Sequence, residues 1–306
     1  MTFQPNSDIS GNRVRRAGSG HAVRNGGIAL GGVGGLGVIL VLLFNAFTGS
    51  SLDMESLGIT GDQQAQYQPA GAEETLGECL TGADANEKIE CRMQGTALSL
   101  DQYWGQELPQ QAGIAYELPD FLLFEGRVST GCGTAGSEVG PFYCPPDATV
   151  YIDTSFFSEL TSRYGADQGP LAELYVVAHE FGHHIQNQLG TFAQADRIKT
   201  GPYSDQVRIE LQADCYAGMW VKGASETRDA QGISYLMKPS QTDIASALSA
   251  AAAVGDDHIQ ETFTGEVQPH NWTHGSSEQR QRWFTTGLTQ GSLSSCDTFS
   301  VADENL

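Results

Sequence analysis

One stretch limits what this chain can fold into more than any other. It is the apolar run LAELYVVAHEFGHHIQNQLG, residues 171–190, which holds three histidines and a glutamate within six positions. The run has the length and composition of a buried helix, and at about 100° per residue His179 and His183 lie on one face of it. Their imidazoles can therefore meet one cation. Glu180 lies between them in sequence. Its side chain is rotated round the helix far enough not to bind the cation, but it can reach a water bound to the cation.

The pattern His-Glu-x-x-His on a helix supplies two zinc ligands and a general base that acts on a zinc-activated water. The third histidine, His184, lies about 140° round the helix from His179. We therefore expect it to support the structure or the ligands rather than to bind the metal. The alternative for the whole motif is a helix whose polar side chains are simply satisfied by hydrogen bonds.

Catalytic zinc needs a third protein ligand and an open fourth position. The extended metzincin pattern is excluded, because Gln186 replaces its glycine and Leu189 its third histidine. The segment ELQAD offers a glutamate instead. Glu210 and Asp214 share a face of an otherwise apolar helix, and buried carboxylates need a cation or hydrogen-bond donors. We assign Glu210 to zinc and Asp214 to the free N–H of a ligand histidine.

Alternatives to this third ligand stay open. Both carboxylates can face solvent, or Asp214 can be the ligand in place of Glu210. The rival histidines, which have no helical spacing to recommend them, are His258, His270 and His274.

The segment NWTHGSSEQRQRWF, residues 271–284, adds a second kind of candidate. His274 stands at a turn before the last helix, from which it can lean over the metal and donate to the oxyanion of a tetrahedral intermediate. Arg280, one helical turn further on, can orient a carboxylate or the wall of the site. A surface histidine with a solvated arginine fits the spacing equally well. Upstream, the pair Asp256 and Asp257 either binds a second cation or caps a helix.

The chain is strongly acidic, with a formal charge of −21. Residues 1–48 hold four arginines and one acid, so the remainder carries 12 basic and 36 acidic residues, a charge of −24. Such a surface repels nucleic acid and offers no basic stripe for phosphates. We predict no nucleic-acid partner.

The N-terminal region predicts a membrane anchor. Residues 1–27 are polar, basic and without apolar periodicity, so we expect a disordered cytoplasmic tail. The twenty residues 28–47, IALGGVGGLGVILVLLFNAF, carry no charge and are long enough to cross a hydrocarbon core about 30 Å thick. The basic residues precede them, and the positive-inside rule then places the N-terminus in the cytoplasm and the rest outside. A cleaved signal peptide is the alternative, although the polar prelude is long for one.

These signals divide the chain into four parts. They are a tail (1–27), one transmembrane helix (28–48), a flexible stalk rich in Gly, Gln, Ser and Ala (49–75) and an extracytoplasmic domain (76–306). Periodicity in the domain predicts strands at 120–130 and 148–157 and helices at 99–113, 155–165, 170–190, 205–222, 240–256 and 276–287. Early strands and late helices indicate an α+β fold with a small sheet and a helical core. The strand at Val150–Asp153 is a candidate edge for strand addition by a peptide.

The six cysteines all lie beyond the apolar segment, and their number is even, as expected where disulfides persist. They are Cys79, Cys91, Cys132, Cys144, Cys215 and Cys296. Six cysteines allow 15 pairings. Proximity favours the two short loops 79–91 and 132–144, which leaves 215–296. Free thiols in a reducing compartment are the alternative.

Taken together, HEFGHHIQ, ELQADC and THGSSEQRQRWF resemble the bacterial neutral zinc metallopeptidase family of membrane-anchored proteins. The early segment GCGTAGSEVGPFYCPPDATVYIDTSFF is similar to it too, so the resemblance runs from about Cys79 to Phe299. The wider likeness is to gluzincins, and it implies a zincin-like fold. It also implies one zinc ion on His179, His183 and Glu210, with Glu180 as base and Asp214 behind a ligand histidine.

His274 matches a threonine–histidine turn that follows the metal-binding helices in one branch of the gluzincins. A proline follows that histidine in the branch, whereas Gly275 follows it here.

We therefore expect a membrane-anchored endopeptidase of the bacterial cell envelope, in which zinc and Glu180 act on a peptide or protein substrate. Two alternatives remain: an envelope protein that zinc merely stabilises, and a zinc hydrolase of a non-protein amide. A structural site would be closed by four protein ligands. The sequence offers three good ones and leaves Glu180 over.

Overall fold

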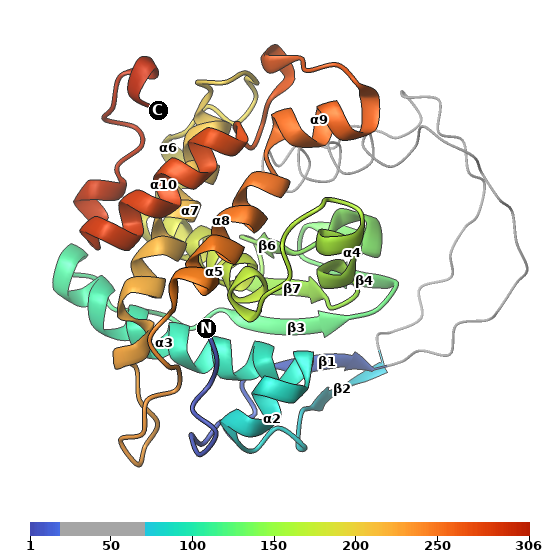
Figure 1. Ribbon diagram of the computed structural model, residues 1–306, viewed down its shortest axis with the longest axis vertical. Coiled ribbons are helices and arrows are strands. Elements are labelled where there is room, and N and C mark those ends of the chain that lie inside the picture. Colours follow the sequence, from blue (N-terminus) through green and yellow to red (C-terminus); the bar gives the residue numbers. More distant parts are fainter. Residues whose placement is uncertain (19–70) are drawn as a thin grey trace, which may run out of the picture.

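A computed structural model describes residues 1–18 and 71–306 of the chain, and the predicted membrane segment lies outside them. The fold is α+β, as predicted (Figure 1). The strands are β1 (Arg15–Gly18), β2 (Gly71–Thr75), β3 (Asp120–Phe124), β4 (Arg127–Thr130), β5 (Gly133–Gly136), β6 (Phe142–Cys144) and β7 (Thr149–Asp153). The helices are α2 (Gly82–Glu87), α3 (Ile89–Ala112), α4 (Phe156–Ser162), α5 (Pro170–Leu189), α6 (Thr191–Gln194), α7 (Asp205–Gly223), α8 (Gln241–Ala253), α9 (Asp256–Thr264) and α10 (Ser277–Gln290).

The main sheet has five strands in the order β2-β1-β3-β7-β6. Strands β1, β3 and β7 run parallel, while β2 and β6 pair antiparallel at the two edges. Side chains alternate along β3. Phe121 and Leu123 join the core shared with the helices, whereas Leu122 and Phe124 pack with the residues of the β4–β5 hairpin. Both faces of the sheet are therefore covered.

The prediction of an edge strand at Val150–Asp153 is wrong. Strand β7 lies between β3 and β6, and its backbone groups pair on both sides. Its inward face carries Val150 and Ile152, as the alternation predicted, but the neighbours of a strand are decided by distant parts of the chain.

The helices form the other layer and carry the candidate site. Helix α5 begins at Pro170 and ends before Gly190, whose φ of 75° gives the left-handed cap that glycine favours. Helix α7 packs against α5, and α10 packs along α7. Ser276 caps α10 with a capping box, in which its hydroxyl accepts from the backbone of Gln279.

Several predicted boundaries are wrong. Helix α3 begins at Ile89, ten residues before the predicted start at 99, because the segment around Cys91 is part of the same helix. The predicted strand at 120–130 is two strands in different sheets, and the helix α9 was missed. The end of the predicted stalk is strand β2, paired with β1.

The N-terminal tail is the largest correction. Residues 1–18 are not disordered. Phe3, Ile9 and Val14 are buried in the main core, and β1 is an interior strand of the sheet. The sequence gives no warning, because a segment with so few apolar residues lacks periodicity and is ordered only by partners far along the chain. Residues 19–27 lie outside the described part.

All three predicted disulfides are present: Cys79–Cys91, Cys132–Cys144 and Cys215–Cys296. The third ties the end of the chain to α7. No helix within residues 1–18 and 71–306 is long and apolar enough to cross a membrane.

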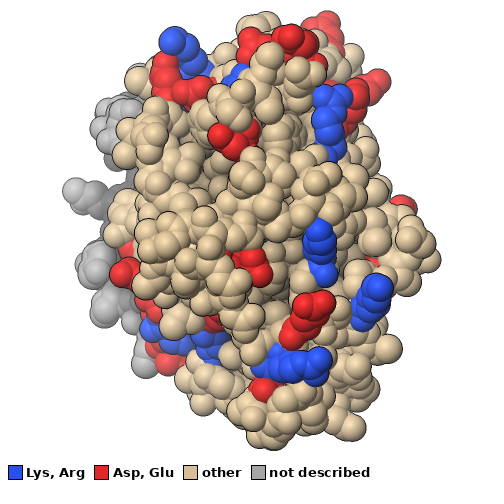
Figure 2. Space-filling view, turned by 90° about the vertical axis from the view of Figure 1, so that its left-hand side faces the viewer, with Lys and Arg blue, Asp and Glu red and all other residues tan. Residues whose placement is uncertain are grey.

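Charge on the face in Figure 2 is dispersed. Lysine and arginine side chains are scattered there among acidic and uncharged ones, with no basic stripe. The absence of a nucleic-acid partner stays a prediction.

Candidate metal centre

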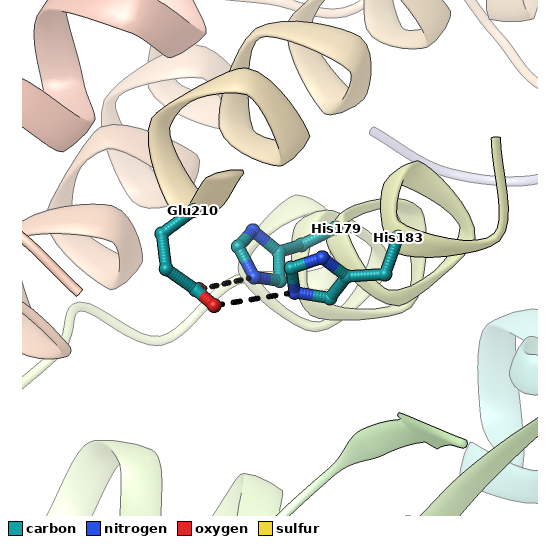
Figure 3. A group of neighbouring side chains, drawn as sticks. All are labelled: His179, His183 and Glu210. Carbon is teal, nitrogen blue, oxygen red and sulfur yellow. Dashed lines mark hydrogen bonds and ion pairs between the residues drawn. The ribbon is translucent and has the colours of Figure 1, made fainter. Parts of the chain in front are cut away.

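Helices α5 and α7 cross so that three potential ligands meet. One ligand atom each of His179, His183 and Glu210 lies within 4.8 Å of the others. Nε2 of His179 is 3.1 Å from Glu210 Oε2, and Nε2 of His183 is 3.6 Å from Oε1 of the same carboxylate. Figure 3 shows Glu210 reaching from its own helix toward the two rings. Gly182 allows this approach, because a Cβ there would lie 3.0 Å from the backbone of Ala213.

Behind His179 lies a charged network. Its Nδ1–H donates to Asp214 Oδ1 across 2.8 Å, and the hydroxyl of Tyr175 donates to the same oxygen across 2.5 Å. Arg280 donates to both carboxylate oxygens of Asp214, across 2.8 and 3.0 Å. Burial alone would raise the pKa of Asp214, but the charges of Arg280 and His179 hold it below its ordinary value.

Behind His183 lies a neutral amide instead. Nε2 of Gln186 donates to the carbonyl of Ile209 across 2.7 Å and to Gln212 Oε1 across 3.0 Å. Its Oε1 therefore faces His183 and accepts from Nδ1–H across 2.9 Å. Burial lowers the pKa of His183 to about 4, which keeps the ring neutral at pH 7.

These partners orient both rings. Each Nδ1 carries a hydrogen that a neighbour accepts, so each Nε2 faces the Glu210 carboxylate. A cation at this point would take the place of the second proton of His179, and both Nε2 atoms could then direct a lone pair toward it. Two imidazole nitrogens and one carboxylate oxygen form a donor set used by catalytic zinc. The residues present therefore fit a zinc ion.

Glu180 is next to this group but not part of it. Its side chain is buried, and within residues 1–18 and 71–306 no hydrogen bond holds its carboxylate. Burial raises the pKa of Glu180 to about 7, while the charges of His179 and Glu210 act on it in opposite directions. A carboxylate poised in this range suits proton transfer near neutral pH.

Asp256 holds His274 on the turn before α10. Oδ2 of Asp256 accepts the backbone N–H groups of Thr273, His274 and Gly275 across 2.8, 2.7 and 3.0 Å. Oδ1 of Asp256 lies 3.3 Å from Nδ1 of His274. Burial opposes the effect, but Asp256 raises the pKa of His274 above its ordinary value. The charge of His274 in turn acts to lower the pKa of Glu180 and of Glu210.

The acidic pair left open by the sequence thus has a structural role. Asp256 holds the His274 turn, and Asp257 Oδ1 accepts from the backbone N–H and the hydroxyl of Ser277, both across 2.8 Å. Backbone and hydroxyl donors occupy the pair, which supports capping over a second cation.

The rival ligands do not join the group. Nε2 of His258 lies 2.8 Å from the carbonyl of Tyr164, and His270 is exposed. Asp214 contacts Nδ1 of His179, on the side of the ring away from Glu210, so it does not replace Glu210. His184 fastens α5 to the sheet, with Nδ1 3.0 Å from the hydroxyl of Tyr143.

Sequence reasoning missed two supporting residues, Tyr175 and Gln186. Tyr175 precedes His179 by four positions and Gln186 follows His183 by three, so each shares a helix face with the histidine that it supports. That spacing was the available signal.

A His-Glu-x-x-His helix faced by a glutamate from a second helix defines a candidate centre of the zinc-peptidase class. The chain belongs to the family described as "Putative neutral zinc metallopeptidase", whose pattern matches residues 1–299. This match confirms the resemblance expected from the motifs and includes the N-terminal residues.

The relatives carry no assigned activity. Uncharacterized protein Rv2575 of Mycobacterium tuberculosis is 52% identical over 229 residues, which cover 74% of this chain and 76% of the relative. Uncharacterized protein YpfJ of Escherichia coli is 36% identical over 273 residues, which cover 88% of this chain and 87% of the relative. Solved structures include no significant match to this chain.

Proposed function

We propose that this protein is a zinc-dependent endopeptidase. One observation carries the proposal: the side chains of two histidines and a glutamate converge beside Glu180, a buried carboxylate that no hydrogen bond holds within the described part of the chain. Three ligands leave a fourth position for water or substrate, as in catalytic zinc sites.

A zinc ion held by His179, His183 and Glu210 would supply a Lewis acid, which would lower the pKa of water and polarise a carbonyl. Glu180 takes the proton of the water that attacks the peptide carbonyl, and it then returns a proton to the leaving amine. Its buried position beside the ligand residues favours both transfers.

His274 has the second role at the substrate. Asp256 holds its turn through three backbone N–H groups and stabilises the protonated ring. We assign His274 to donate a hydrogen bond to the carbonyl oxygen as negative charge develops there. Asp214 and Arg280 act behind His179 and keep its ring in place.

Two other functions remain to be separated by experiment. A zinc-stabilised envelope protein needs no free base, so the buried Glu180 speaks against it. A zinc hydrolase of a non-protein amide would use the same centre. The purified protein, with and without a chelator, is assayed for zinc, for casein and peptide-library hydrolysis, and for release of amines from cell-wall fragments. Chelator-sensitive peptide hydrolysis supports the proposal, while zinc without any hydrolysis supports the structural role.

The substitution Glu180→Gln tests the base directly. Zinc content should stay at the wild-type level, because Glu180 is not a ligand, while peptide hydrolysis should fall about 10²–10⁴-fold. Glu173→Gln, the same change on the same helix outside the centre, is the matched control and should leave turnover nearly unchanged. Undiminished turnover by Glu180→Gln would rule out the assigned base.

We further propose that the protein is attached to a bacterial membrane and acts on peptides or proteins there. The support is the uncharged run at 28–47 in the sequence. The three disulfides support an extracytoplasmic location, because disulfides persist in oxidising compartments.

A further inference from the structure

The first 18 residues, here called the N-terminal arm, are held by the domain as a bound peptide would be. Both backbone groups of Phe3 pair with the side-chain amide of Asn86, each across 2.9 Å. The ring of Phe3 fills the space above Gly95, where a Cβ would collide with it. Nε2 of Gln94 donates to the carbonyls of Ile9 and Cys79, across 2.5 and 3.2 Å. The arm therefore lies against the Cys79–Cys91 disulfide.

Backbone pairing continues along both sides of the arm. The segment that follows α7 supplies one side: Gln4 N donates to Tyr235 O, and Met237 N donates to Thr2 O, both across 2.9 Å. The sheet supplies the other, since β1 lies between β2 and β3. Without the arm, β2 would lose the one strand partner that it has among the described residues, and β3 would become an edge.

Charge reinforces the fit. Nε of Arg13 lies 2.5 Å from Asp101 on α3, and Arg15 lies 2.7 Å from Asp120. Arg16 pairs with Glu90 through Nε, across 3.0 Å. These are three of the four arginines on which the positive-inside prediction rested. In the folded protein they pair with carboxylates of the acidic domain, so their positive charge need not mark the cytoplasmic side.

We infer that the N-terminal arm and residues 71–306 fold as one body on the same side of the membrane. Gly18 and Gly71 are register partners of β1 and β2, so the two ends of the intervening segment leave the domain at one point. A cytoplasmic N-terminus with an extracytoplasmic domain is incompatible with this pairing. A single membrane crossing between the arm and the domain is incompatible with it too, whereas attachment without such a crossing is compatible. The inference does not depend on the proposed activity.

A disulfide across the register tests the pairing in cells. The full-length protein carries Arg16→Cys and Glu74→Cys, which are register partners, and a protease site placed between residues 60 and 70. After lysis under thiol-blocking conditions and proteolysis, the two fragments should stay joined until a reductant is added. The control protein carries Arg16→Cys together with Glu278→Cys on α10. Its two fragments should separate without a reductant. Separation of the β1–β2 pair to the same extent as the control would overturn the inference.

Sidedness is then measured without relying on that pair. Asn6→Cys in the arm and Glu278→Cys in the domain are both at exposed positions and are made singly. Intact cells that express each full-length variant are treated with a membrane-impermeant maleimide before and after permeabilisation. The inference predicts the same pattern for both sites. Labelling of one site only after permeabilisation, when the other needs none, would overturn it even if the cysteine pair fails to fold.

Discussion

The two sides of the metal centre differ in what stands behind the ligand. His179 is hydrogen-bonded to the buried carboxylate of Asp214, which Arg280 and Tyr175 also contact, whereas His183 is hydrogen-bonded to the neutral amide of Gln186. A charged partner raises the basicity of an imidazole as well as fixing its tautomer, while an amide fixes the tautomer alone. The stability of the charged side is also more sensitive to substitution, because removal of one charge leaves another buried without its partner.

This difference implies a division of labour between the sides. We expect the His179 side to determine both metal affinity and stability and the His183 side to determine mainly orientation. Four changes, given from the largest expected effect to the smallest, test this difference.

Glu210→Gln removes the ligand that both sides share. Zinc affinity should fall more than about 100-fold, the upper end of what loss of a supporting residue costs. Competition with a calibrated zinc chelator measures it. Glu226→Gln, an exposed glutamate just beyond α7, is the control and should bind zinc normally. Normal affinity in Glu210→Gln would remove this residue from the ligand set.

Asp214→Asn breaks the charged side. It leaves Arg280 buried beside a neutral group, so the free energy of unfolding should fall by about 3–5 kcal/mol, and zinc affinity should fall up to about 100-fold. Denaturant unfolding and chelator competition measure the two effects. Asp205→Asn at the start of the same helix is the control.

The double variant Asp214→Asn with Arg280→Gln separates the two effects. It should recover part of the stability, because no charge is then stranded, but none of the zinc affinity. Recovery of both would mean that Asp214 serves only Arg280 and not the ligand histidine.

Gln186→Met breaks the neutral side. The carbonyl of Ile209 and Nδ1 of His183 lose a partner, so we expect a loss of about 1–3 kcal/mol in the free energy of unfolding and about tenfold in zinc affinity. Gln110→Met, the same change at an exposed position of α3, should change neither. A loss as large as that of Asp214→Asn would abolish the distinction between the sides.

The metal-free protein should show the difference as opposite pH dependences. Although burial opposes it, Asp214 raises the pKa of His179 from 6.5 to about 10, so its stabilisation is complete below pH 6.5 and is lost as pH rises toward 10. Burial lowers the pKa of His183 to about 4, so stability is lost as pH falls from 6.5 toward 4.

Urea unfolding with a chelator present, across roughly pH 4.5–9.5, measures both limbs. His179→Asn should flatten the alkaline limb and His183→Asn the acidic one. Burial also lowers the pKa of His184 to about 4, so that residue keeps part of the acidic limb in every variant. If both substitutions flattened the same limb, the two sides would not differ in charge.

Much of the centre was predictable because it is written in helical spacing. His179 and His183 four apart, and Glu210 and Asp214 four apart, each define one face of one helix. We inferred that the two helix faces meet from the free-energy cost of burying carboxylates without partners, and the structure does bring the two faces together. Gln186 was not predicted, because its role depends on the carbonyl of Ile209 in the facing helix.

The sheet and the N-terminal arm show the opposite case. Strand β1 lies beside β3, about a hundred positions away, and its identity as a strand depends on that pairing. Local pattern marked these residues as a tail, and it also misplaced β7 at an edge.

By itself, the sequence determined the motif helix with its caps, the ligand faces, the α+β class and the cysteine pairs, because these depend on contacts a few residues apart or on simple proximity. Only the tertiary structure decided the order of the strands, the amide behind His183, the role of Asp256 and the burial of the arm. Each of these depends on hydrogen bonds or packing between segments remote in sequence, and no local period records such contacts.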